Sequence, residues 1–86
     1  KDGKRKRFLD DLKKSREIVK LTVIAFESPF RLLKTLEDIK NVFGEIDVVI
    51  CRELTKMYEE IKREKVSEII EYFLINGPKG EFIILF

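Results

Sequence analysis

The stretch that decides the fold is LTVIAFESPFRLLKTLEDIKNVFGEIDVVIC, residues 21–51. Residues 21–26 are apolar and rich in β-branched side chains, which predicts a strand covered on both faces, as in a parallel sheet under helices. Ser28 and Pro29 then provide the N-cap and first residue of a helix. Apolar residues recur at helical spacing until Gly44, which is expected to end that helix. Because a second apolar strand follows at residues 47–51, the stretch predicts a βαβ unit.

The sequence on either side of this unit adds further elements. Residues 5–15 predict a short helix, residues 67–76 a third helix with Ser67 as its cap, and residues 81–86 a final strand. Residues 55–65 fit either a helical turn or a loop with a short strand. We therefore expect a single domain over residues 1–86 of the α/β class, with a small mixed sheet and flanking helices.

Composition excludes several classes of function. No apolar run approaches the ~20 residues that cross a bilayer, so no membrane span is expected. The chain has no histidine, which argues against hydrolase triads and zinc sites, and no metal is expected. Cys51 is the only cysteine, so an internal disulfide is impossible. A lone thiol in an apolar run is typical of a small core residue in a cytoplasmic protein.

Charge is unevenly distributed along the chain. Residues 1–20 carry nine Lys or Arg against four Asp or Glu, whereas the remainder is mildly acidic. This basic head, defined as Lys4, Arg5, Lys6 and Arg7, favours a polyanionic partner such as RNA. The chain also begins at Lys1 and stops within an apolar run, so we expect it to be a piece of a longer protein.

Polar side chains gather after the two predicted strands. Glu27 follows the first strand, and Arg52, Glu53 and Lys56 follow the second, while Arg31 lies in the first turn of the intervening helix. In open α/β sheets, ligands bind at these strand ends, although ordinary ion pairs on a solvated rim would show the same pattern. The four glycines lie at turns and form no phosphate-binding loop. A nucleotide-like cofactor would therefore be held mainly by residues outside this chain.

Three segments resemble a known family. Residues 26–36, FESPFRLLKTL, resemble the aromatic-Glu-Ser-Pro-His-Arg-Leu segment of the ribosomal RNA cytidine 2'-O-methyltransferases, in the tetrapyrrole methylase superfamily. Residues 51–56, CRELTK, resemble that family's Ala-Arg-Glu-Leu-Thr-Lys segment, and an acidic pair follows at residues 59–60. Residues 79–82, KGEF, match a third stretch. Order and spacing agree across residues 4–86, so the resemblance covers essentially the whole chain.

The resemblance implies a larger two-domain methyltransferase that binds S-adenosylmethionine between its domains. Its glycine-rich cofactor loop would lie in an N-terminal domain outside this chain, which would be the C-terminal domain. Residues 58–62 would then form a short strand antiparallel to residues 47–52. The implied activity is 2'-O-methylation of a cytidine ribose in small-subunit (16S) ribosomal RNA by a cytoplasmic homodimer.

Individual roles follow less directly. Glu27 and Glu53 are the candidates to accept the proton of a ribose hydroxyl, although nearby arginines favour a weakly basic carboxylate. Phe30 stands where the family has histidine, so no titrating role carries over to it. We expect Arg52 to hold Glu27 or a phosphate through two parallel hydrogen bonds. The candidates for RNA binding or for lining the cleft are Lys4, Arg5, Lys6, Arg7, Arg31, Arg52 and Lys56.

Two other functions stay open at this point. One is a non-catalytic RNA-binding module, in which the basic head contacts phosphates and Phe8 or Phe30 stacks on a base. The other is a tetrapyrrole or small-molecule methylase of the same superfamily. A glycine-rich loop upstream of residue 1 would distinguish an enzyme from a binding module.

Overall fold

The computed structural model describes residues 2–18, 22–53 and 56–86, which form helices and strands in alternation. In chain order the elements are α1 (Asp2–Ile18), β1 (Ile24–Glu27), α2 (Pro29–Phe43), β2 (Asp47–Arg52), β3 (Glu60–Lys65), α3 (Val66–Asn76) and β4 (Phe82–Leu85). This alternation confirms the α/β class. Helix α1 is longer than the predicted residues 5–15, and the ambiguous segment contains a strand.

The sheet has the strand order β1-β4-β2-β3, and each neighbouring pair is antiparallel. The implied pairing of β3 with β2 is confirmed, with Asp47 opposite Lys65 and Arg52 opposite Glu60. The expectation of a mixed sheet with directly paired parallel strands is wrong for the described strands. β1 and β2 do run in the same direction around α2, but β4 lies between them. The final apolar strand thus takes the central position that local sequence patterns left open.

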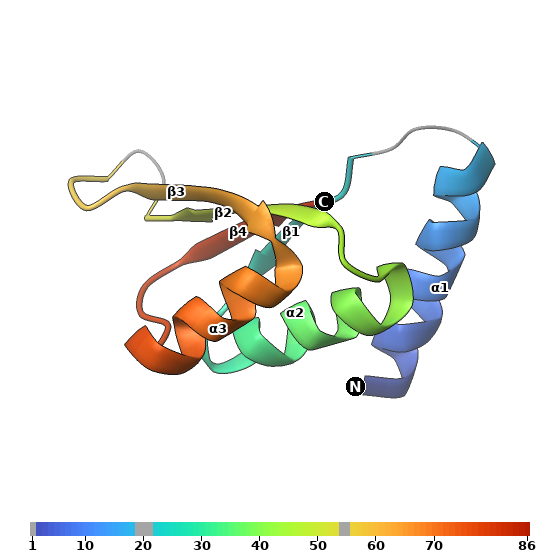
Figure 1. The fold of residues 1–86 in the computed structure, drawn as a ribbon, viewed down its shortest axis with the longest axis horizontal. Coiled ribbons are helices and arrows are strands. Elements are labelled where there is room, and N and C mark those ends of the chain that lie inside the picture. Colours follow the sequence, from blue (N-terminus) through green and yellow to red (C-terminus); the bar gives the residue numbers. More distant parts are fainter. Residues whose placement is uncertain (1, 19–21, 54–55) are drawn as a thin grey trace.

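In the part of the chain that the structure describes, the helices lie on one face of the sheet and leave the other uncovered. Figure 1 shows α2 and α3 side by side beneath the strands, with α1 against the end of α2. The prediction that the first strand is covered on both faces is therefore wrong, since Ile24 is 60% exposed and Phe26 79% exposed. An apolar run in the sequence predicts that both faces of a strand are covered, but it does not show whether the covering atoms belong to this chain.

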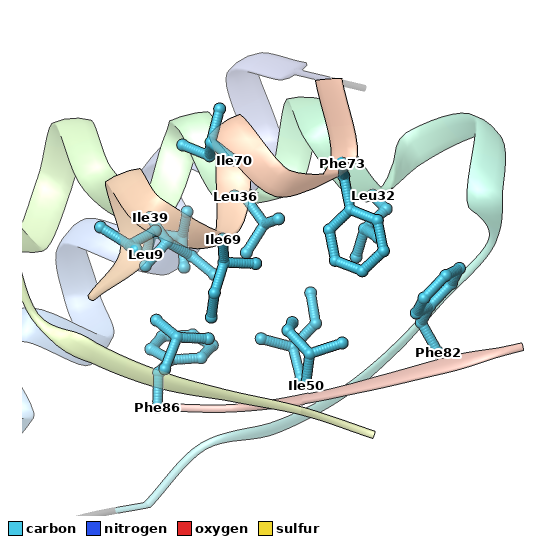
Figure 2. Close-up of a cluster of buried hydrophobic side chains, with 13 residues drawn as sticks. Leu9, Leu32, Leu36, Ile39, Ile50, Ile69, Ile70, Phe73, Phe82 and Phe86 are labelled. Carbon is cyan, nitrogen blue, oxygen red and sulfur yellow. The ribbon is translucent and has the colours of Figure 1, made fainter. Parts of the chain in front are cut away.

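The core fills the space between the helices and the inner face of the sheet (Figure 2). Ile50 and Phe82 point from β2 and β4 toward Leu36 of α2 and Phe73 of α3. The rings of Phe73 and Phe82 meet edge to face, 5.4 Å apart between centroids. This aromatic pair fixes the start of β4 beneath α3, and thereby fixes the loop that joins them.

The helix boundaries test the predicted caps. Ser28 is the N-cap of α2 and Pro29 its first residue, as predicted, and Gly44 ends the helix. The prediction that Ser67 caps α3 is wrong, because Lys65 is the N-cap and Ser67 lies inside the first turn. The Ser67 hydroxyl instead donates a hydrogen bond to Glu45, which is the largest cause of the lowered pKa of that carboxyl. This bond connects α3 to the loop before β2.

Candidate functional site

The carboxyl ends of β1 and β2 meet at one end of the molecule. Glu27 lies opposite Phe82 on one side of β4, and Arg52 lies opposite the same Phe82 on the other side. The β2–β3 loop and the α3–β4 loop gather at this end as well, on the left of Figure 1. We call the region formed by these two loops and the β1–α2 turn the loop end. The sequence correctly predicted that the two strand ends are near neighbours, although one strand separates them.

Arg52 joins three segments of the loop end. Its Nε lies 3.3 Å from a carboxylate oxygen of Glu60, at the start of β3. Its two terminal nitrogens each donate to a backbone carbonyl at 3.4 Å, one of Tyr58 and one of Lys79. The expected pairing of Arg52 with Glu27 is not what the structure shows, since the guanidinium is occupied by partners from β3 and both loops. The planar fork is well suited to this task, because it offers several donors in fixed directions.

Glu53 connects β2 to the start of β4. Its backbone adopts a left-handed conformation with φ of 50°, which is uncommon outside glycine. In this conformation its N–H donates to the Glu81 carbonyl at 2.9 Å, and its carboxylate accepts the Glu81 N–H at 2.6 Å. Lys56 completes the connection, with its ammonium 2.8 Å from the Glu81 carboxylate and 3.7 Å from that of Glu53. The RELTK and KGEF segments are therefore in direct contact, through Glu53 and Lys56 on one side and Glu81 on the other.

The pairing of Lys56 with Glu81 shifts the pKa of both side chains. The hydrogen bond from Lys56 lowers the pKa of Glu81, and the same bond is the largest cause of the raised pKa of Lys56. Both groups lie in solvent, so this is a surface pair that water and salt screen.

Glu27 has a different environment. One carboxylate oxygen accepts a 2.6 Å hydrogen bond from the hydroxyl of Thr35, which lies in α2 eight residues further along the chain. The other accepts the Ser28 N–H at 3.2 Å and lies 3.8 Å from Nε of Arg31. The glutamate thus fixes the entry into α2 while remaining beside open space.

That open space is a pocket of about 420 Å³ at the end of β1 and the start of β4. Phe26 and Ile83 provide apolar side-chain surface, since the ring of Phe82 is buried in the core, and Glu27 and Glu81 also line the pocket. Its volume lies within the range of ~300–1,000 Å³ that is usual for small-molecule sites. The chemistry suits a flat, partly apolar ligand that donates hydrogen bonds.

The predicted RNA-binding residues do not form one surface. Lys4, Arg5, Lys6 and Arg7 belong to α1, which Figure 1 places at the opposite end of the molecule from the β2–β3 loop. Arg31 and Lys56 lie at the loop end and are about half exposed, whereas the guanidinium of Arg52 is largely occupied. The side-chain placement of Arg5 falls outside what the structure describes.

Sequence reasoning missed some participants in the loop end. Glu60 and Glu81 each pair with a cation, yet neither was among the predicted site residues. The KGEF segment did mark the neighbourhood of Glu81, but carbonyl partners such as those of Tyr58 and Lys79 leave no trace in a side-chain pattern. Cys51 is buried and unpaired with another cysteine, as its apolar context predicted.

The described residues lack two kinds of feature, a metal site and a membrane-spanning helix. Over 2–18, 22–53 and 56–86 there is no group of His, Cys, Asp or Glu arranged to hold a metal ion. Within the same ranges, no helix combines the length and the apolar character needed to span a membrane.

The fold and the loop end define an α/β domain with a surface pocket beside an ion-pair network. No protein-family model matches the chain. It is similar, however, to curated proteins called ribosomal RNA small subunit methyltransferase I. The protein of Thermotoga maritima is 43% identical over 81 residues, which is 94% of this chain and 35% of that relative. That of Rickettsia prowazekii is 42% identical, covering 78% of this chain and 24% of the relative. That of Streptococcus pyogenes is 36% identical, covering 99% and 28%.

These matches confirm the resemblance on which the sequence analysis relied. The chain is related to the C-terminal part of the ribosomal RNA small subunit methyltransferase I proteins. It spans about a third or less of the length of the relatives it matches.

Proposed function

We propose that this chain is part of an S-adenosylmethionine-dependent enzyme that 2'-O-methylates a cytidine ribose in small-subunit ribosomal RNA. The observation that carries the proposal is the similarity, over nearly the whole chain, to relatives whose name is ribosomal RNA small subunit methyltransferase I. The cofactor, the cytidine and the ribose oxygen come from the family resemblance of the three segments.

The pocket at the loop end fits one part of such a cofactor. Phe26 provides exposed apolar surface of the kind that a purine ring requires, and the carboxylates of Glu27 and Glu81 can accept hydrogen bonds from an amino group or from ribose hydroxyls. When bound, S-adenosylmethionine supplies a methyl group already activated on a sulfonium, so the protein mainly has to align the reactants. Within this chain, Thr35 and the α2 N-terminus hold Glu27 in place for that purpose.

The candidates for proton transfer remain proposals. The Glu27 carboxylate already accepts from Thr35 and Ser28, and the Glu53 carboxylate accepts from Glu81. Both carboxylate oxygens of Glu27 and one of Glu53 are therefore already held by donors from this chain. We therefore propose orienting roles for Glu27 and Glu53 and place the acceptor of the ribose proton outside this chain.

RNA contacts are proposed at two separate places. The basic head of α1 would contact phosphates without reading sequence, and Arg31 with Lys56 would contact the strand that enters the cleft. By the same resemblance, the intact enzyme would be a cytoplasmic homodimer.

The test is methyl transfer by the full-length protein that contains this segment. Labelled S-adenosylmethionine and small ribosomal subunits that lack the modification are the substrates, and digestion of the RNA identifies the product as 2'-O-methylcytidine. The 86-residue chain alone should transfer no methyl group, because it has no phosphate-binding or cofactor loop.

Each alternative gives a distinct result. RNA binding by the full-length protein without methyl transfer would favour the non-catalytic module. Transfer to a tetrapyrrole but not to the subunits would favour the other branch of the superfamily. Transfer by the 86 residues alone would contradict the proposed division of the site.

A further inference from the structure

The face of the sheet that the helices leave uncovered is almost entirely apolar. The register places two rows of side chains across the four strands on this outer face. One row, next to the loop end, is Phe26, Ile83, Cys51 and Ile61. The other row is Ile24, Leu85, Val49 and Arg63. Seven of these eight side chains are apolar. Among the described strands, charge enters this face with Arg63 at the β3 edge and with the ion pair of Asp47 and Lys65, one row further from the loop end.

This outer face differs from an ordinary exposed surface. An antiparallel sheet with one solvated face normally alternates apolar residues toward the core with polar residues toward water. Here Ile24, Phe26 and Ile61 are all more than half exposed, while Val49 and Ile83 are partly exposed between them. A continuous apolar surface of this kind is typical of an interface.

The size of the outer face argues against an independent partner. Four strands about 4.8 Å apart, with two rows of residues about 7 Å apart along each strand, give a footprint of a few hundred Å². A stable complex between separate molecules usually buries ~800 Å² on each side. A segment of the same polypeptide needs less area, because the covalent connection raises its effective concentration.

The relatives supply such a segment. The aligned region covers only 35% of the Thermotoga maritima protein and 28% of the Streptococcus pyogenes protein, so about two thirds of each relative lies outside it. Phe26 and Ile83 also belong to both the outer face and the pocket at the loop end. A segment that covers the outer face would therefore also supply a missing wall of the pocket.

We propose that the outer face is a docking surface for the part of the longer protein that precedes this chain. The docked surface should be apolar and poor in charge, to match the seven side chains it covers. The proposal depends on the relation to longer relatives but not on methyl transfer, since the contact would form without cofactor or RNA.

The experiment is hydroxyl-radical footprinting of the full-length wild-type protein, without S-adenosylmethionine and without RNA. Phe26 and Ile61 report on the outer face, and Leu74 and Ile75, exposed on α3, are the matched controls. We expect oxidation of Phe26 and Ile61 to be at least about tenfold slower than in the unfolded protein, with Leu74 and Ile75 oxidised freely. Rapid oxidation of all four would overturn the proposal.

A second measurement separates the preceding segment from a second copy of the chain. Light scattering identifies monomer and dimer at two protein concentrations, and footprinting is repeated at each. Protection of Phe26 should persist in the monomer, whereas its loss on dilution would assign the outer face to a dimer interface and overturn the proposal. Ile61→Glu should increase the oxidation of Phe26, while Ile75→Glu should not. Equal effects of the two substitutions would also contradict docking at this face.

Discussion

Glu27 at the end of β1 and Glu53 just after β2 lie on opposite sides of β4, yet the two carboxylates are held differently. Glu53 is bound through both its backbone and its side chain to Glu81, and its neighbour Arg52 ties three segments together. Glu27 is bound only to the start of its own helix and to Thr35, and it borders the pocket. One side of β4 is thus a closed network, and the other side is an open site.

This difference shows that FESP and RELTK, two charged segments that each follow a strand, have different roles in the structure. The RELTK segment concentrates charge after a strand, a pattern that is typical of a reactive site. In the structure, however, Arg52 and Lys56 of this segment hold the β2–β3 loop and the α3–β4 loop in place. FESP makes fewer of the hydrogen bonds and ion pairs that join loops, and its Phe26 and Glu27 line the pocket. A ligand is therefore expected to contact the Glu27 side first, and the Glu53 side to determine whether the pocket wall at Glu81 is in place.

The largest effect on activity is expected from Glu27. Glu27→Gln in the full-length enzyme keeps the size of the side chain but removes the charge that would accept hydrogen bonds from a ligand. Loss of one charge-assisted hydrogen bond corresponds to about a 10- to 100-fold weaker interaction. We expect this as a rise in KM for S-adenosylmethionine, measured by steady-state methyl transfer.

Thr35→Val is the control for Glu27, because it removes the hydroxyl that holds the carboxylate without touching the pocket. If Glu27 matters only through α2, the two variants should lower the melting temperature alike and change KM alike. A KM effect confined to Glu27→Gln would establish the open site.

Substitution of Arg52, unlike that of Glu27, should mainly lower the stability of the protein. Arg52→Ala removes three contacts at once and should cost about 1–3 kcal/mol of unfolding free energy, measured by chemical denaturation. Arg52→Lys should be nearly as damaging, because an ammonium cannot reach Glu60 and two carbonyls in the same plane. Arg7→Ala, at an exposed position on α1, is the control and should change stability little. If Arg52→Ala were as stable as the wild type, the contacts of Arg52 would not stabilise the Glu53 side of β4, and the contrast with the Glu27 side would be wrong.

Gly80 tests how tightly Glu53 and Glu81 are joined. Its φ is +95°, and a Cβ at this position would lie 2.8 Å from a carboxylate oxygen of Glu53. Gly80→Ala should therefore displace that carboxylate as well as strain the backbone. Gly77→Ala is matched, since its φ is +71° but nothing lies within 4 Å. We expect Gly80→Ala to be more destabilising by about 1 kcal/mol, the usual contribution of one hydrogen bond, in parallel denaturation curves. Equal losses would show that the carboxylate moves freely.

Much of the fold was readable because its signals are local. α2 has a cap, a first-turn proline, a helical apolar period and a terminal glycine, and its predicted bounds are confirmed. β3 was ambiguous because EIKREK carries charges on both faces, which is typical of an edge strand that must not aggregate. The order of the strands was not readable, since periodicity says which face is buried but not which strand lies alongside.

The candidate site divides in the same way. That Glu27 and Arg52 approach the same end of the sheet follows from the direction of their strands. The partners of Arg52 do not follow, because two of them are backbone carbonyls in loops whose position depends on the packing of Phe73 against Phe82. Sequence patterns therefore located the site but could not distinguish its closed side from its open side.

The smallest effect is expected from the exposed pair of Lys56 and Glu81 at the rim of the closed side. Because the pKa of Glu81 is lowered by folding, its stabilising contribution is present above its ordinary value of 4.5 and is lost as pH falls through the lower folded pKa. Because the pKa of Lys56 is raised, its contribution is present below 10.5 and is lost as pH rises through the higher folded pKa. The difference in melting temperature between wild type and Glu81→Gln should therefore be largest between these limits and should shrink in high salt. Glu71→Gln, at an exposed position of α3, is the control, and a Glu81→Gln difference that neither pH nor salt changes would show that Glu81 acts through its backbone alone.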